Sequence, residues 1–315
     1  MPDSHPTPTP TSYTPRRPAR IEHVSIRDMD YACRVWGTPA ADIPVLVLCH
    51  GWMDVGASFQ FLVDALPDGA GLIVAPDWRG FGASQPAQAD HFVHADYLLD
   101  LDYLLDHYSP DRPVHLLGHS MGGNVALLYA AVRPARIRRL VTVESFGLPD
   151  APPAEAPQRL VDWMDQVRAL REGASLLRSY ATLEAVAARL QRTNPRLDAP
   201  RAHWLAGQWA APSGDGSWRL RAHQAHLIPN PQLYRAEEAQ ACLSRITAPT
   251  LCVDAEEDTM AHFWGDRYRR TDYLARMRHI SDVVHIQVPN AGHMLHHDQP
   301  ARLAQLVQQF LHAAA

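Results

Sequence analysis

Short runs rich in β-type residues alternate with amphipathic segments along most of the chain. The β-type runs are typical of strands that a parallel sheet buries on both faces, and they are residues 44–49, 71–75, 113–118, 137–144, 249–253 and 283–288. Apolar residues recur at helical spacing between them, at residues 59–66, 97–105, 268–277 and 300–311. A further pair of strands is predicted at residues 21–27 and 31–36. This alternation predicts βαβ units and a mostly parallel sheet, an α/β fold.

The alternation stops at Gly147 and resumes near Pro249. Residues 148–246 contain no convincing strand, begin with several prolines and then have the spacing of helices at 158–171 and 183–192, followed by a Trp-rich stretch. We therefore predict one α/β core made of residues 21–147 and 247–315, with residues 148–246 inserted as a helical cap, or lid. Residues 1–20 are rich in proline, so we expect them to be extended or disordered.

Composition excludes several classes of function. The 315 residues are 46% hydrophobic and 20% charged with a net charge of -5, and no long basic run suggests a nucleic acid or an anionic membrane as partner. No stretch reaches the roughly 18 apolar residues of a membrane span, and the amino end lacks the pattern of a signal peptide. The four cysteines have no C-x-x-C spacing and are interpreted as buried, reduced side chains. We expect a cytoplasmic protein without stable membrane association.

Ser120 lies between a predicted strand and a predicted helix. The sequence there reads Gly118-His-Ser-Met-Gly122, a G-x-S-x-G pattern. Glycines suit a sharp strand-to-helix turn, which strains the serine backbone and brings neighbouring chain too close for a Cβ. Such a turn exposes the hydroxyl and directs the N–H groups of the following helix at developing negative charge. The alternative is a buried serine that only packs in a glycine-rich turn.

Further motifs in a fixed order make the pattern more specific. They are His50-Gly-Trp52, Asp77-Trp-Arg-Gly-Phe-Gly-Ala-Ser84, the turn at Ser120 and Ala291-Gly-His293. With them, the chain from about residue 21 onward resembles the α/β-hydrolase superfamily. His50-Gly-Trp-Met-Asp54 followed by Ser58-Phe59 is similar to its serine-hydrolase and esterase-lipase branches, which carry a helical lid. The resemblance implies the α/β-hydrolase fold and catalysis by a Ser-His-acid triad.

The resemblance implies that Ser120 attacks a carbonyl carbon while His293 takes its proton and later protonates the leaving group. Two residues compete for the acid that orients the imidazole. Asp258 follows a predicted strand in a turn similar to the superfamily's G-x-x-D, with Ala255 in place of the glycine, whereas Glu144 ends the strand before the lid. We favour Asp258 over Glu144, with Asp254 a more distant third.

The same resemblance implies an oxyanion hole made by the backbone N–H groups of Trp52 and Met121. Aromatic residues of the lid and of the turn after the third strand are expected to line an apolar substrate pocket, and the predicted pocket residues are Trp52, His119, Trp163 and Trp204. His296, His297 and Asp298 lie together, but no second group of ligands has suitable spacing, so no metal site is predicted.

These features predict a serine hydrolase that cleaves a carboxylic ester with an apolar acyl or aryl group through an acyl-enzyme. The predicted partner is a small-molecule ester, and the chemistry needs no cofactor. A thioester or carbon–carbon bond hydrolase would use the same triad. Because a fold does not fix a function, a cofactor-free oxygenase or a non-catalytic binding protein is the alternative of another class.

Overall fold

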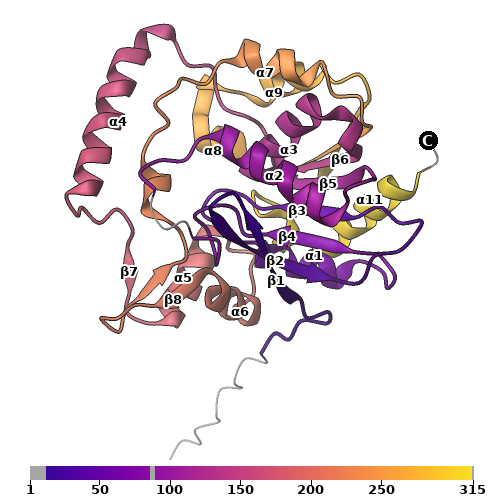
Figure 1. Cartoon of the computed structure of the whole chain (residues 1–315), viewed down its shortest axis with the longest axis horizontal. Coiled ribbons are helices and arrows are strands. Elements are labelled where there is room, and N and C mark those ends of the chain that lie inside the picture. The colour runs from indigo at the N-terminus through magenta and orange to yellow at the C-terminus, as the bar shows by residue number, and fades with distance from the viewer. Residues whose placement is uncertain (1–11, 86–88, 314–315) are drawn as a thin grey trace, which may run out of the picture.

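The computed structural model describes residues 12–85 and 89–313 (Figure 1). Its centre is an eight-stranded sheet in the order β1-β2-β4-β3-β5-β6-β10-β11. The strands are β1 Arg20–Ile26, β2 Met29–Trp36, β3 Leu46–Cys49, β4 Ile73–Pro76, β5 Val114–His119, β6 Ile137–Val143, β10 Thr250–Ala255 and β11 Val283–Val288. Only the β1–β2 and β2–β4 pairs are antiparallel. The predicted α/β fold with a mostly parallel sheet is confirmed.

Helices cover both faces of this sheet, because the central strands are apolar on both sides. One face carries η1 Gly56–Phe59, α1 Gln60–Ala65 and α11 Pro300–His312, and the other carries α2 His94–Tyr108, α3 Met121–Val132, α7 Ala236–Leu243 and α9 Arg270–Met277. Helix α7 falls inside the segment predicted as the cap, yet it packs against α3 and α9 of the core. The part that stands apart from the core therefore ends before α7.

The insertion, which we define as residues 148–246, is less regular than predicted. It begins with η3 Pro153–Glu155 and contains α4 Ala156–Arg171, α5 Leu183–Thr193, α6 Ala199–Trp209 and η4 Gln224–Leu227 besides α7. It also holds a three-stranded sheet of β7 Ser179–Tyr180, β8 Ala210–Pro212 and β9 Trp218–Leu220. The prediction of no strand was wrong, because strands of two or three residues are too short to show alternation.

The two ends of the insertion are joined to each other at the edge of the core. The Ala151 N–H donates to the Tyr234 carbonyl at 3.1 Å, and the Ala236 N–H donates to the Asp150 carboxylate at 2.8 Å. Just before them, the Gly147 N–H donates to the Asn124 side chain at 3.0 Å. The chain is therefore fixed in place before it leaves the core and again where it returns.

The amino-terminal segment from residue 12 onward is docked on the core, so of the two expectations, an extended or a disordered chain, disorder does not hold for residues 12–20. The backbone N–H groups of Arg16 and Arg17 donate to the Asp64 carboxylate at 3.0 and 2.9 Å. Tyr13 also donates to Asp64, and its ring lies edge-on between Phe61 and Trp204. Residues 1–11 lie outside the described residues. The docked segment links α1 of the core to α6 of the insertion.

All four cysteines are free; Cys33, Cys49 and Cys252 are buried as expected, whereas Cys242 is only partly buried. In the described ranges, 12–85 and 89–313, no helix is both long and apolar enough to cross a bilayer.

Candidate active site

Ser120 occupies a strained turn between β5 and α3. Its φ of 52° lies in the left-handed region, which is costly for a residue with a side chain. Close packing around the turn explains the glycines, since a Cβ on Gly118 would lie 2.4 Å from the Gly122 carbonyl oxygen and one on Gly122 would lie 2.1 Å from that of Cys49. The Ser120 carbonyl accepts the N–H groups of Gly123 and Asn124 at the start of α3. The residues thus form the predicted nucleophile elbow.

His293 and Glu144 complete a hydrogen-bonded chain that starts at Ser120. The Ser120 Oγ lies 3.1 Å from His293 Nε2, and His293 Nδ1 lies 3.3 Å from Glu144 Oε2. Glu144 is 1% exposed, directly follows β6 and has a left-handed φ of 51°. Its carboxylate also accepts the Ala255 N–H and the Thr259 hydroxyl, each at 2.6 Å. Ser120, His293 and Glu144 are therefore in contact in the order that a Ser-His-acid triad requires.

The structure brings Glu144, and not the favoured Asp258, to the imidazole. Asp258 is exposed at the start of α8 Thr259–Trp264, where its carboxylate accepts the Ala261 N–H at 3.0 Å as an N-cap. Asp254, the third candidate, is buried against Arg270 at 3.2 Å and Tyr273. The preference for Asp258 is corrected because a left-handed turn at residue 144 redirects the chain, and strand patterns do not reveal such a turn.

Burial sets the protonation states in this chain of groups. It lowers the pKa of His293 to about 4, which keeps the imidazole neutral and able to accept a proton at neutral pH. Burial also raises the pKa of Glu144, while the Ala255 N–H and the Thr259 hydroxyl oppose that rise by stabilising the carboxylate. The neutral imidazole is the form that general-base catalysis requires.

The backbone N–H groups of Trp52 and Met121 are free to serve as the predicted oxyanion hole. Across residues 12–85 and 89–313, neither of these two backbone groups donates a hydrogen bond. Met121 is the first residue of α3, where backbone N–H groups have no intrahelical acceptor. Gly51 keeps the two loops close, since a Cβ there would lie 3.2 Å from that of Ser120.

His50 and Asp77, which also belong to the sequence motifs, stabilise the turn that carries Trp52. His50 Nε2 accepts the Trp78 N–H at 2.8 Å, so its Nδ1 carries the proton and donates to the Gly51 carbonyl at 2.7 Å. Asp77 accepts the N–H groups of Gly56 and Ala83 at 2.8 and 2.9 Å. These buried hydrogen bonds hold the turn that carries Trp52.

A second acidic residue of the core also has a role that the sequence pattern missed. Asp100 of α2 is fully buried and binds the Arg79 guanidinium through both oxygens at 2.7 Å. It also accepts the Tyr31 hydroxyl at 2.5 Å. This bidentate pair anchors the turn after β4 to α2.

The predicted pocket residues divide into different environments. Trp52 is 52% exposed, and its indole N–H donates to the His226 carbonyl at 3.2 Å. Trp204 instead packs against Phe61 and Tyr13, and Trp163 lies edge-on to His91. His119 is 2% exposed, and its Nε2–H donates to the His293 carbonyl at 2.7 Å. His119 is therefore too buried to line an open substrate pocket, whereas Trp163 and Trp204 as pocket residues stay a prediction.

Phe263 is an aromatic neighbour of the site that the sequence analysis missed. It lies in α8, is 47% exposed, and its ring is 5.0 Å from that of His293 in an edge-on arrangement. Its position in a six-residue helix after β10 gave no periodic signal. With Trp52, it leaves exposed apolar surface close to the reacting groups.

Ligand-type side chains also come together, although no metal site was predicted. Within the described residues, Asp54, His119 and His296 form such a group beside the elbow. They are distant in sequence, so spacing alone could not reveal the group.

Comparisons with known proteins agree with this fold. The family model for the alpha/beta hydrolase fold matches residues 44–300, and the chain belongs to this family. A serine hydrolase-like protein of Dictyostelium discoideum is 23% identical over 92% of this chain and 81% of its own length. A putative carbamate hydrolase of Variovorax paradoxus is 29% identical over 80% of this chain and 86% of its own.

Among solved structures, the thioesterase domain from the curacin biosynthetic pathway aligns with a TM-score of 0.77. It is 23% identical, and the alignment covers 92% of this chain and 99% of that domain. At this identity the likeness supports the fold. Together with the named relatives, the family match defines the protein as a serine hydrolase-type α/β hydrolase.

Proposed function

We propose that this protein hydrolyses a carboxylic ester with an apolar acyl or aryl group, with Ser120 as nucleophile, His293 as general base and Glu144 as the orienting acid. The observation that carries the proposal is the contact chain of 3.1 Å from Ser120 Oγ to His293 Nε2 and 3.3 Å from His293 Nδ1 to Glu144. A serine hydroxyl is a weak nucleophile unless a neighbouring base takes its proton.

In the first half of the proposed reaction, Ser120 Oγ bonds to the ester carbonyl carbon while its proton passes to His293 Nε2. The N–H groups of Trp52 and Met121 stabilise the resulting oxyanion. Collapse breaks the bond to the alcohol, which leaves with the proton from His293. Water then attacks the acyl-enzyme by the same route, and the acid is released with Ser120 restored.

The apolar substrate class follows from the side chains nearest the site. Trp52 and Phe263 are both about half exposed, and the Phe263 ring lies 5.0 Å from that of His293. Leu148, Leu160 and Met164 of the insertion are further exposed apolar side chains. Such surface favours an apolar acyl or aryl group over a charged one.

The direct test combines p-nitrophenyl esters with a fluorophosphonate probe. We expect an initial burst of p-nitrophenol, covalent labelling of the native protein, and loss of both in Ser120→Ala with an unchanged circular dichroism spectrum. A native protein that neither hydrolyses these esters nor takes up the probe would contradict the proposal and favour a binding function. Parallel assays with a thioester, a carbamate and a carbon–carbon bond substrate separate the ester from the other bonds this triad could cleave.

A further inference from the structure

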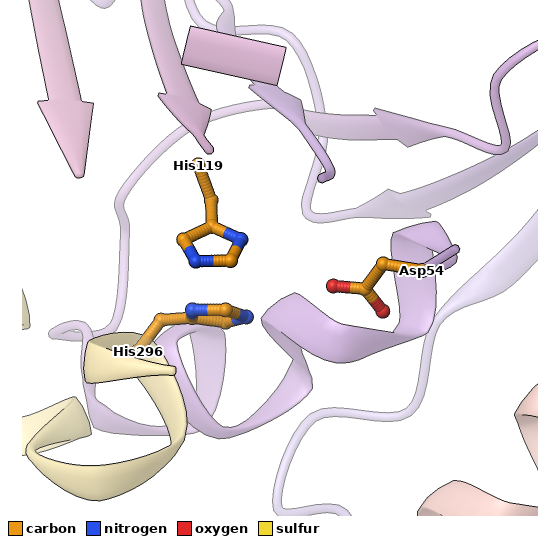
Figure 2. Close-up of side chains that lie close together, drawn as sticks. All are labelled: Asp54, His119 and His296. Carbon is orange, nitrogen blue, oxygen red and sulfur yellow. The ribbon is translucent and has the colours of Figure 1, made fainter. Parts of the chain in front are cut away.

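A group of buried side chains beside the elbow has no role in the proposed reaction. Asp54 lies in the turn after β3, His119 ends β5, and His296 lies in α10 Leu295–Asp298. One ligand atom from each lies within 4.8 Å of the other two. Figure 2 shows the Asp54 carboxylate and the two imidazole rings turned toward one another. The three residues are 3%, 2% and 0% exposed, so the group is cut off from solvent.

Hydrogen bonds fix which nitrogen of His119 is available. Its Nε2 contacts the His293 carbonyl oxygen at 2.7 Å, and because a carbonyl only accepts, Nε2 carries the proton. With the proton on Nε2, Nδ1 holds the lone pair of the neutral ring. Nδ1 has no hydrogen-bond partner in residues 12–85 and 89–313.

Asp54 and His296 also present unused atoms. Asp54 Oδ1 accepts the Val55 N–H at 2.7 Å and the Ser58 hydroxyl, whereas Oδ2 makes no hydrogen bond to any described residue. Within the same ranges, neither ring nitrogen of His296 has a partner. Buried polar atoms are rarely left without partners, because their desolvation is then uncompensated. Unpaired acceptors on three residues therefore call for a shared donor or cation.

We propose that Asp54, His119 and His296 bind a divalent transition-metal ion of the Zn²⁺ class. Two imidazole nitrogens and one carboxylate oxygen are a ligand set that suits Zn²⁺, with the fourth position left to water. Ligand atoms around a tetrahedral zinc lie about 3.3 Å apart, so a separation of up to 4.8 Å requires the side chains to close by up to about 1.5 Å.

The surroundings of the ligands match those of known metal sites. Metal-binding imidazoles generally donate their other N–H to a carbonyl or a carboxylate, as His119 does to the His293 carbonyl. Metal-binding carboxylates are themselves hydrogen-bonded, as Asp54 is to Ser58 and Val55. The ion would join three segments that are far apart in sequence. These segments adjoin Trp52, Ser120 and His293, the residues of the proposed reaction. Metal binding itself does not depend on that proposed function.

Calorimetric titration of the chelator-treated full chain with ZnCl₂ tests the site without reference to hydrolysis. We expect one Zn²⁺ per chain and a rise in Tm of roughly 5 °C when free Zn²⁺ is at a hundred times Kd. Titration with Co²⁺ should produce visible absorption bands with the intensity of a four-coordinate site. If the space holds only buried water, no saturable binding occurs and the proposal is overturned.

His296→Leu and Asp54→Asn test the ligand set. His296→Leu removes two unpartnered buried nitrogens, so the metal-free variant should fold with an unchanged or higher Tm. Asp54→Asn keeps an oxygen for Val55 and Ser58. Each should bind Zn²⁺ at least roughly 100-fold more weakly than the native chain.

His297→Gln is the matched control, because His297 is a buried neighbour on the same helix whose Nε2 contacts Ser58 at 3.2 Å. Its Kd for Zn²⁺ should stay within threefold of the native value. Equal Zn²⁺ affinity in the native chain and in His296→Leu, or loss of binding in His297→Gln alone, would overturn the assigned ligands.

Discussion

The end of β6 and the turn after β10 each carry a carboxylate that the sequence made a candidate for the triad. Glu144 follows β6 in a left-handed conformation and is 1% exposed, whereas Asp258 is exposed and caps α8. The turn after β10 nevertheless contributes to the site, since its Ala255 N–H and its neighbour Thr259 hold the Glu144 carboxylate. The comparison teaches that a segment can support a catalytic acid without supplying it.

Glu144→Gln and Asp258→Asn test this division most directly. Glutamine keeps the shape of Glu144 but cannot stabilise an imidazolium, so kcat for an activated ester should fall about 10³–10⁴-fold. Asparagine is an equally good N-cap, and Asp258→Asn should change kcat less than threefold. Steady-state kinetics with matched circular dichroism spectra decide the matter. A larger loss of kcat in Asp258→Asn than in Glu144→Gln would instead identify Asp258 as the acid.

Thr259→Val sharpens the comparison by removing one of the groups that hold Glu144. Valine preserves the shape but leaves the carboxylate without its 2.6 Å hydroxyl donor, so kcat should fall about tenfold while KM changes little. Thr259→Ser, which restores the hydroxyl, should recover most of the activity. If Thr259→Ser is as slow as Thr259→Val, the hydroxyl does not position the acid.

The pH dependence of kcat/KM gives the smallest but most specific effect. His293 must be neutral to accept the Ser120 proton, and burial lowers its pKa from the ordinary value of 6.5 to about 4. The neutral form therefore persists as pH falls, and the acidic limb of the profile should lie well below pH 6.5. Asp258→Asn should leave that limb unmoved. A native limb at or above pH 6.5 would contradict the assigned environment of His293.

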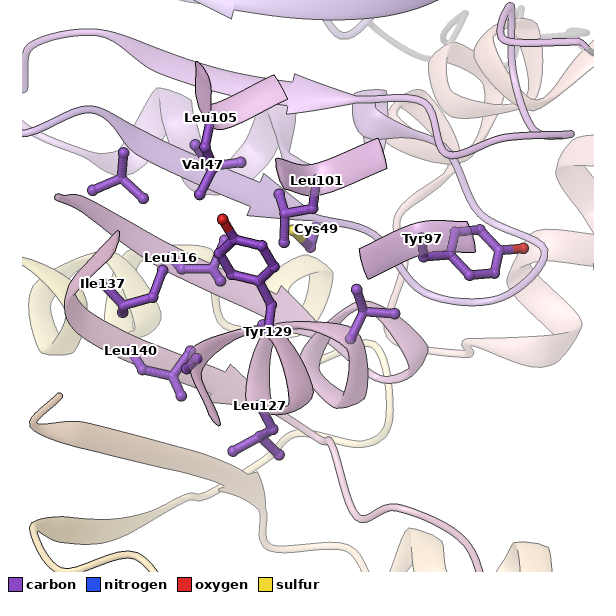
Figure 3. Packing of buried hydrophobic residues seen from close by; sticks show 14 of the residues in the cluster. Val47, Cys49, Tyr97, Leu101, Leu105, Leu116, Leu127, Tyr129, Ile137 and Leu140 are labelled. Atoms are coloured by element: carbon purple, nitrogen blue, oxygen red, sulfur yellow. The ribbon is translucent and has the colours of Figure 1, made fainter. Parts of the chain in front are cut away.

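Most of the core was predictable because its pattern reflects burial on both faces of a sheet. Figure 3 shows the result, with Tyr129 of α3 and Leu101 of α2 packed over Val47 and Leu116 of the central strands. Periodicity locates such elements because every residue facing the sheet must be apolar. The contact between Ser120 and His293 was also predictable, since short local motifs mark both residues.

The acid and the insertion were harder to predict for physical reasons. The choice of Glu144 depends on one left-handed φ and on contacts with a segment more than a hundred residues away, neither of which leaves a periodic trace. In the insertion, β7 and β8 are too short for alternation to appear, and α4 has no buried residue. Where few side chains are buried, the pattern carries little information about structure.

The hydrogen bonds that join the two ends of the insertion hold its points of exit and return next to each other. Residues 152–233 begin and end at backbone positions that the Ala151–Tyr234 and Ala236–Asp150 bonds hold together, outside the stretch that fixes Glu144. The chain between these two points also bonds to the core, through His226 to Trp52 and Arg79 and through Asn194 to Asp298. A module spliced between them would have to replace these contacts to keep the Trp52 turn in place, whereas the contacts that hold the Glu144 carboxylate would stay with the core.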